Sequence, residues 1–164
     1  MAISKTEYAQ RIQSSRSRLY RTAFCYVKNE QDALDIVGEA VCKGLEALHQ
    51  LRQVEFFDTW MTRIVIHTAL SHLRKHALRP ENNEELPESL PATEAGLTPE
   101  ESIDLYQALD TLGGSERTYV ILRFFEERSF REMAEILNLP EATVKSRLYR
   151  ILKKLNHQLS ARKE

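Results

Sequence analysis

The sequence has 164 residues, of which 42% are hydrophobic and 29% charged, and its formal net charge is -1. A chain of this length can form one domain or two small ones, each with a core of its own. No apolar run reaches membrane-spanning length and the N-terminus carries no apolar signal-peptide segment, so we expect a cytoplasmic protein. Phosphate-loop, GxSxG and GxGxxG motifs are also missing, so phosphate-loop, serine-hydrolase and dinucleotide chemistry have no support in the sequence.

The charges are distributed unevenly along the chain. Residues 1–76 carry 11 basic and 8 acidic side chains, and residues 105–164 carry the same numbers, so each segment has a net charge of +3. Residues 77–104 carry 1 basic and 8 acidic side chains, a net charge of -7. This asymmetry predicts two mildly basic modules on either side of an acidic connector.

The N-terminal module begins with two predicted helices. Residues 6–27 carry apolar side chains along one helical stripe, and Asn29 is a suitable N-cap for the next helix, which runs from residue 31 to about residue 49. The face opposite its apolar side is acidic, a pattern that by itself is typical of a solvated surface. The apolar face of this second helix consists of Ala33, Ile36, Val37, Ala40, Val41, Gly44, Leu45 and Leu48.

A third helix is predicted after a short irregular stretch, residues 50–55, and extends to about residue 76. Phe56, Phe57 and Trp60 open it. Aromatic side chains at a helix start more often belong to a core than to a binding surface. Aromatic residues beside arginines can nevertheless stack on unpaired bases and neutralise phosphates, and both interpretations hold if the residues divide between core and surface.

Histidine and cysteine pairs predict no metal or cofactor. His72 and His76 are four residues apart, which is a metal-ligand spacing, but no HExxH glutamate and no third ligand is evident. Cys25 and Cys42 lie on separate predicted helices without CxxC spacing, and we expect both to be buried thiols of a reducing compartment.

The acidic connector lacks helical periodicity. Residues 77–98 contain three prolines, several glutamates and no apolar stripe, as an extended linker does. Helical structure is predicted to resume at Thr98, which is followed by a proline at the first helical position and a glutamate at the third. This helix should end at Gly113, and Ser115 should cap the next one.

The segment SFREMAEILNLPEATVKSRLYRILKKL, residues 129–155, has the pattern of a helix-turn-helix. Ser129 and Glu132 are spaced as a capping box, and Asn138 followed by Leu-Pro ends the first helix. The second helix could enter a DNA major groove, although a helical hairpin with a solvated basic face is the alternative. Its apolar positions step by four, three and four residues through Val144, Leu148, Ile151 and Leu155.

Together these patterns predict an all-α protein with two small helical domains, residues 1–76 and residues 99–164, joined by an acidic flexible linker, residues 77–98. The C-terminal domain is expected to have four helices, all of which are needed to enclose one small core.

With both modules defined, the chain resembles the extracytoplasmic-function group of sigma-70 RNA polymerase sigma factors. Residues 19–48 and 56–76 are similar to sigma region 2, and residues 108–155 are similar to region 4, with TVKSRL the most specific fragment. The family usually has Gln at the position of Gly38 and Asn at the position of His67.

The resemblance implies an alternative sigma factor that binds core RNA polymerase, at the coiled-coil of its largest subunit and at its flap, and directs promoter-specific transcription initiation. Such a protein is not expected to be an enzyme or to have a small-molecule substrate. It also implies control by an anti-sigma factor, often membrane-anchored, and a linker that threads basic channels of the polymerase or acts as a solvated tether. The alternative is a stand-alone helix-turn-helix regulator, although residues 1–76 contain no recognisable receiver or ligand-binding pattern and no dimerisation heptads.

Three sets of residues take their expected roles from this resemblance. Docking on the polymerase is assigned to Asp32, Asp35, Glu39 and Lys43. Capture of the unpaired minus-ten strand is assigned to Arg52, Phe56, Trp60, Arg63, His67, Arg74 and Lys75. Binding of the minus-thirty-five duplex is assigned to Arg131, Thr143, Lys145, Ser146, Arg147, Tyr149 and Arg150.

Overall fold

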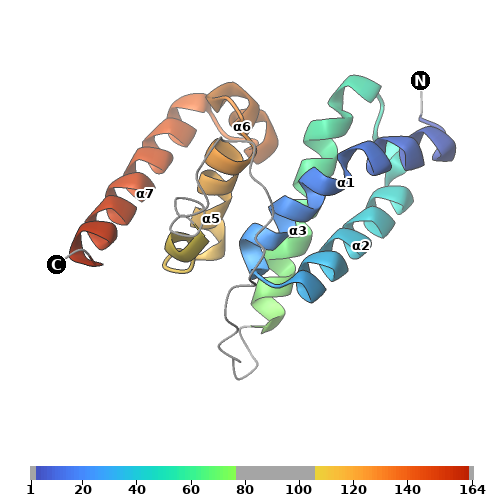
Figure 1. The fold of residues 1–164 in the computed structure, drawn as a ribbon. Coiled ribbons are helices and arrows are strands. Elements are labelled where there is room, and N and C mark those ends of the chain that lie inside the picture. Colours follow the sequence, from blue (N-terminus) through green and yellow to red (C-terminus); the bar gives the residue numbers. More distant parts are fainter. Residues whose placement is uncertain (1–2, 77–105, 163–164) are drawn as a thin grey trace. The chain divides into compact units, whose positions relative to one another are not determined.

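The computed structural model of the protein describes residues 3–76 and 106–162 and divides the chain into two compact units, Met1–Pro91 and Ala92–Glu164 (Figure 1). We call them the N-terminal and C-terminal units. All regular secondary structure in the described residues is helical, which confirms the predicted fold class. No helix among the described residues is both long and apolar enough to span a membrane. The predicted linker, residues 77–98, and the helix start at Thr98 lie outside the described residues.

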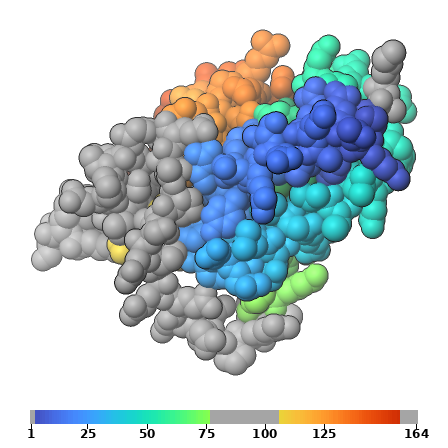
Figure 2. Space-filling model, turned by 45° about the vertical axis from the view of Figure 1, so that its right-hand side comes forward, coloured from blue at the N-terminus to red at the C-terminus, as the bar shows by residue number. Residues whose placement is uncertain are grey.

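Three long helices form the N-terminal unit, and each packs against the other two. The helices α1 and α2 lie side by side along one face of it (Figure 2). Asn29 is the N-cap of α2, as predicted, because its side chain accepts a 2.8 Å hydrogen bond from the backbone N–H of Asp32. The elements are α1 (Lys5–Val27), α2 (Glu30–Glu46), the short 3-10 turns η1 (Leu48–Gln50) and η2 (Val54–Phe56), and α3 (Phe57–His76).

Tyr8 organises the core where the three helices meet. Its hydroxyl donates a 2.7 Å hydrogen bond to the backbone carbonyl of Val41, and its ring meets that of Phe57 edge to face at 6.1 Å. A methyl group at Gly44 would collide with this hydroxyl, so α2 needs a glycine at the point of closest approach. Burial, followed by the charge of Cys42, raises the pKa of Tyr8 to about 12, because the phenolate would be desolvated in this core.

Four expectations for α2 and the segment after it are wrong. The helix ends at Glu46 rather than near residue 49, and the two 3-10 turns take up both ends of the stretch 50–55, so that only residues 51–53 are irregular. Leu45 is 44% exposed, because it lies one position past Gly44 and therefore about 100° around the helix from the buried stripe. Cys42, one position past Val41, is exposed in the same way, whereas Cys25 is buried as predicted.

The C-terminal unit combines short helical elements with one long helix, Glu141–Arg162. Ser115 does not cap α5, because the helix already begins at Gly114, with Gly113 as an N-cap that forms no side-chain hydrogen bond. A π-helical turn then continues the chain into the helix-turn-helix. The elements are a helical turn at residues 106–109, α5 (Gly114–Val120), the π-turn η3 (Ile121–Phe125), α6 (Phe130–Leu137) and α7 (Glu141–Arg162).

Candidate functional site

The outer face of α2 is acidic, as predicted, but it also carries apolar side chains. Asp35, Glu39 and Lys43 are exposed, and the Lys43 Nζ atom lies 3.1 Å from Glu39 Oε1. Leu34 and Leu45 stand exposed on the same helix, at 45% and 44%. Sequence periodicity contained a signal for Leu34, since this residue falls outside the buried stripe of α2. The exposed surface of α2 therefore offers a partner charge at Asp35 and Glu39 and, farther around the helix, apolar surface at Leu34 and Leu45.

Asp32, grouped with that face in the sequence, is half-buried at the N-terminal end of the helix. It occupies the third position of α2, where its carboxylate accepts a 2.9 Å hydrogen bond from the Asn29 amide. The carboxylate is half-buried and its Oδ2 atom lies 3.6 Å from Nε2 of His72 on α3. Asp32 thus lies about two turns before Glu39 on the same side of α2, but it contacts His72 of α3 and is less exposed than Asp35 and Glu39.

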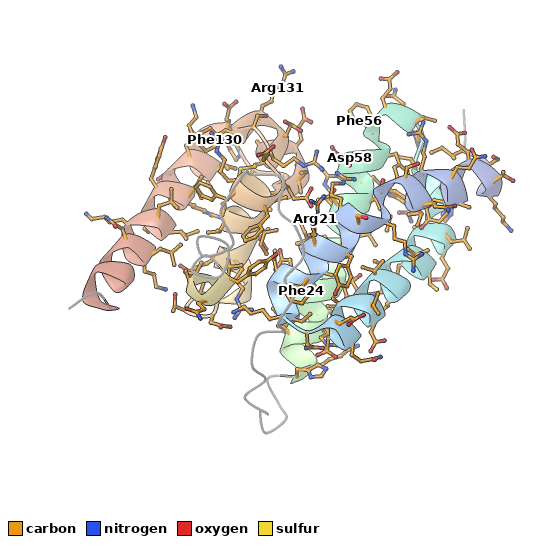
Figure 3. All side chains as sticks on the ribbon, in the orientation of Figure 1. Arg21, Phe24, Phe56, Asp58, Phe130 and Arg131 are labelled. Atoms are coloured by element: carbon orange, nitrogen blue, oxygen red, sulfur yellow. The ribbon has the colours of Figure 1, made fainter. Side chains whose placement is uncertain are left out.

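The aromatic residues at the start of α3 divide between surface and core. Phe56 is 52% exposed at the end of η2 (Figure 3). Phe57 is buried, and Trp60 is half-buried against the core cluster. The rings of Phe57 and Trp60 lie 6.0 Å apart in a tilted arrangement. Of the three, Phe56 is therefore the side chain best placed to stack on a base.

The remaining residues assigned to the minus-ten strand extend along α3 rather than around one pocket. Arg52 is exposed before the helix, Arg63 is half-buried, and His67 is exposed one turn later. Arg74 and Lys75 are exposed in the last turn. At 1.5 Å per helical residue, Phe56 and Arg74 are about 27 Å apart, so this set could follow a strand but could not enclose a single base.

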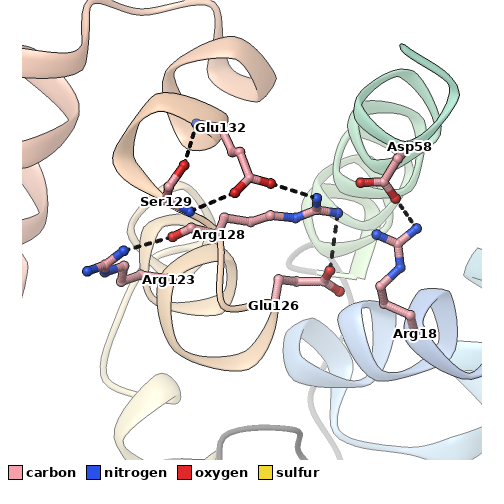
Figure 4. Close-up of polar contacts among 7 residues, drawn as sticks. All are labelled: Arg18, Asp58, Arg123, Glu126, Arg128, Ser129 and Glu132. Atoms are coloured by element: carbon pink, nitrogen blue, oxygen red, sulfur yellow. Dashed lines mark hydrogen bonds and ion pairs between the residues drawn. The ribbon is translucent and has the colours of Figure 1, made fainter. Parts of the chain in front are cut away.

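An open cleft of about 560 Å³ lies beside the start of α3, and no sequence pattern predicts it. The Arg11 guanidinium, on its α1 side, lies 5.7 Å from the centre of the Phe57 ring. The carboxylate of Asp58 pairs with Arg18 of α1 (Figure 4). The cleft is lined by Glu7, Gln10, Arg11, Ser14, Ser15, Val54, Glu55, Phe57 and Asp58.

The helix-turn-helix has the predicted geometry. Asn138 ends α6 in the left-handed conformation, with φ 54° and ψ 49°. The four predicted apolar positions of α7 are all buried. Thr143 is half-buried, and Arg131 projects from the start of α6 (Figure 3). The other predicted duplex-binding residues, Lys145, Ser146, Arg147, Tyr149 and Arg150, are all exposed.

Two contacts that sequence reasoning missed hold basic side chains against this surface. Phe130 forms an aromatic platform, with the Arg123 guanidinium 4.4 Å and Lys145 Nζ 5.3 Å from the centre of its ring. Arg147 donates a 3.1 Å hydrogen bond to the hydroxyl of Tyr119, a mostly buried residue of α5. Such contacts reduce the freedom of long basic side chains before they meet a partner.

A polar network fixes the corner between η3 and α6 (Figure 4). Ser129 and Glu132 form the predicted capping box, with hydrogen bonds of 3.1 and 3.2 Å. Arg128 reaches Glu132 at 3.2 Å and Glu126 at 3.5 Å, and its carbonyl accepts a 2.9 Å hydrogen bond from Arg123. The network therefore links the turn before α6 to the helix-turn-helix itself.

The hydrogen bond from the backbone N–H of Ser129 has the largest effect and lowers the pKa of Glu132. Burial opposes this shift, while the Arg128 guanidinium and the Ser129 hydroxyl lower the pKa further. Because the folded state favours the carboxylate, this stabilisation is present above the ordinary pKa of 4.5 and is lost as the pH falls through the lowered folded value. We expect Glu132→Gln to cost about 0.3–1 kcal/mol at pH 7, and the difference from wild type to shrink in acid.

Thermal unfolding at neutral and acidic pH measures this difference. The matched control is Glu135→Gln, which removes one carboxylate of a surface pair with Arg131, whose atoms are 3.8 Å apart, outside the capping box. A stability gap for Glu132→Gln that stays constant from pH 7 to about pH 3 would contradict the role of its charge.

Comparison with known families matches both units. The family described as sigma-70 region 2 matches residues 11–79, and the family described as sigma-70 region 4 matches residues 102–155. The chain is 39% identical over 149 residues to the RNA polymerase sigma factor SigV of Bacillus subtilis, covering 91% of this chain and 89% of that protein. It is 29% identical over 156 residues to the RNA polymerase sigma-E factor of Streptomyces coelicolor, covering 95% and 88%.

Solved structures share the fold. The sigma factor RpoE in complex with the anti-sigma factor NepR, from Bartonella quintana, superposes with a TM-score of 0.72 at 20% identity, covering 94% of this chain and 97% of that one. CnrH in complex with the cytosolic domain of CnrY superposes with a TM-score of 0.68 at 20% identity, covering 96% and 90%. From the two family matches and the overall identity to SigV, the chain belongs to the extracytoplasmic-function group of the sigma-70 family of RNA polymerase sigma factors.

Proposed function

We propose that this sigma factor docks on core RNA polymerase through the exposed face of α2 and directs initiation at promoters with two recognition elements. The observation that carries the proposal is the order of the two family matches, region 2 on the N-terminal unit and region 4 on the C-terminal unit. The exposed acidic residues of α2, chiefly Asp35 and Glu39, supply the charge for a basic partner surface such as the coiled-coil of the polymerase's largest subunit. Its exposed leucines, Leu34 and Leu45, supply apolar contact.

The N-terminal unit would bind the unpaired minus-ten strand at the start of α3. Exposed Phe56 offers a face for one base, and Arg52 lies close to it in the sequence to neutralise phosphate. Stacking on an aromatic ring contributes about 1–3 kcal/mol per base, which can offset the cost of unstacking a base from the duplex. The basic residues farther along α3 would then follow the strand.

The C-terminal unit would bind the minus-thirty-five duplex with α7. Its buried stripe fixes the helix on the unit, so that the exposed polar and basic residues face outward. The N-terminus of α7 favours a nearby phosphate, and Arg131 at the start of α6 is placed to contact the backbone. Phosphate contacts would position the unit, while side chains in the groove would read the bases.

We further propose that residues 1–76 and 99–164 act as separate modules and that the acidic segment 77–98 connects them. The same surfaces are suited to an anti-sigma factor, which would compete with the polymerase in the cytoplasm and could be membrane-anchored. Support comes from two structurally similar proteins. The sigma factor RpoE was solved in complex with the anti-sigma factor NepR, and CnrH was solved in complex with the cytosolic domain of CnrY.

Transcription with purified core polymerase on a library of genomic promoters tests the proposal. Core enzyme plus this protein is expected to initiate at a defined subset of promoters, whereas the protein alone should bind promoter duplex poorly. Sequence-specific binding to a palindromic site without polymerase, and no specific initiation with it, would instead indicate a stand-alone helix-turn-helix regulator.

Replacing Arg147 with alanine tests base reading by α7. If its guanidinium reads a guanine edge, the substitution should cost about 1–3 kcal/mol and relax the preference at one position of the minus-thirty-five element. Tyr119→Phe is the matched control, since it removes the hydrogen bond to Arg147 and keeps the guanidinium. Competition with promoters that are changed one base at a time measures the affinity and the base preference of each variant. Equal weakening on every sequence would show that Arg147 contacts a phosphate.

A further inference from the structure

The structure adds a third possible metal ligand to the two histidines whose spacing was visible in the sequence. His72 and His76 lie one turn apart on α3, and their imidazole rings stack with centroids 4.1 Å apart. The carboxylate of Asp32 approaches them from α2, although Asp32 precedes His72 by 40 residues in the sequence. One ligand atom from each of the three residues lies within 4.8 Å of the others.

The chemistry of this set suits a divalent transition-metal ion. Two imidazoles and one carboxylate are ligands that zinc accepts, and histidines at i and i+4 on one helix face can share an ion. Zinc–ligand bonds of about 2.0–2.1 Å place tetrahedral ligands about 3.4 Å apart. The 3.6 Å between His72 Nε2 and Asp32 Oδ2 is close to that spacing, so only the wider separations have to contract.

Two further observations indicate that the site is prepared for a ligand. The Nε2 atom of His72 is buried and forms no hydrogen bond within the described residues, although its side chain is only 16% exposed. The amide of Asn29 donates to the Asp32 carboxylate at 2.9 Å, which orients it as outer hydrogen bonds orient metal-ligating carboxylates. An unsatisfied ring nitrogen beside an oriented carboxylate is the arrangement that an ion would complete.

We propose that Asp32, His72 and His76 form a zinc-type metal site that joins the start of α2 to the end of α3. The three side chains occupy three positions of a tetrahedron, and water fills the fourth. Because the ion binds the folded arrangement of two helices, it stabilises the N-terminal unit against unfolding. This inference does not depend on the polymerase or on DNA.

The competing explanation is an ordinary contact between a histidine and a carboxylate, with His76 merely stacked beside it. That contact involves only His72 and Asp32, and it predicts no binding of a transition-metal ion. The two explanations therefore differ on His76, which lies at the end of α3 and can be replaced with little risk to the fold.

Titration of the tag-free full chain with ZnCl₂, followed by calorimetry and thermal unfolding, tests the site. The experiment uses a Cys42→Ser background, so that the exposed thiol cannot bind the metal. We expect one equivalent of zinc to bind with micromolar affinity or better and to raise the unfolding temperature by several degrees, whereas MgCl₂ should do neither because magnesium prefers oxygen ligands.

His76→Ala, His72→Gln and Asp32→Asn should each weaken zinc binding by at least about tenfold, since even the loss of an outer hydrogen bond costs a metal site roughly 10–100-fold. His67→Ala, on an exposed position of the same helix, should bind zinc as the background does. Circular dichroism of each metal-free variant shows whether it is folded. No saturable binding, or binding that His76→Ala leaves unchanged, would overturn the proposal, as would an equal loss in His67→Ala.

Discussion

Replacing Glu39 with lysine is expected to weaken the association of this sigma factor with core RNA polymerase by about 2–3 kcal/mol, or roughly 30- to 160-fold in Kd. Glu39 is exposed near the middle of α2, where its partner within the chain is Lys43. A surface pair of this kind contributes about 0.3–0.5 kcal/mol, so the N-terminal unit should remain folded. Against a basic docking surface, however, lysine would exchange an attraction for a like-charge contact.

Titration of labelled core polymerase with each variant measures the loss, and thermal unfolding shows that the unit is intact. Glu46→Lys is the matched control, because it makes the same charge change on the same helix, about 10 Å farther along the axis. Equal losses in the two variants would indicate a general electrostatic effect of net charge. Unchanged association of Glu39→Lys would remove α2 from the docking surface.

Features set by neighbouring residues were predictable from the sequence. The capping box at Ser129 and Glu132 and the left-handed Asn138 depend on hydrogen bonds and steric limits within a few residues, and the structure has both. The buried stripe of α7 followed from helical spacing for the same reason. Periodicity failed where a helix stops or a side chain lies at the edge of a stripe, as Leu45 does.

Contacts between segments far apart in the chain were not predictable in this way. The spacing of His72 and His76 was visible, but the approach of Asp32 depends on how α2 packs against α3. The hydrogen bond between Arg147 and Tyr119 joins residues 28 positions apart, and no local sequence pattern predicts it. Periodicity in one sequence shows which face of a helix is apolar. It does not show which other helix packs against that face.

The second large effect is expected from Leu148→Ala in the C-terminal unit. Leu148 is 1% exposed on the buried stripe of α7, and truncating such a leucine removes apolar burial and leaves a cavity. We expect the free energy of unfolding of this unit to fall by about 2–5 kcal/mol, a large share of what a small domain has. Because the same stripe holds the exposed face of α7 in place, initiation that depends on the minus-thirty-five element should fall with it.

Chemical denaturation can separate the two units, because the one tryptophan of the chain, Trp60, lies in the N-terminal unit. Its fluorescence should report an unchanged midpoint in Leu148→Ala, while the helical circular dichroism signal loses part of its amplitude at lower denaturant. Leu152→Ala makes the same truncation at a half-buried position of α7 and should cost less. A Trp60 midpoint that moves with that of the C-terminal unit would show that the units unfold together, which contradicts two modules with separate cores.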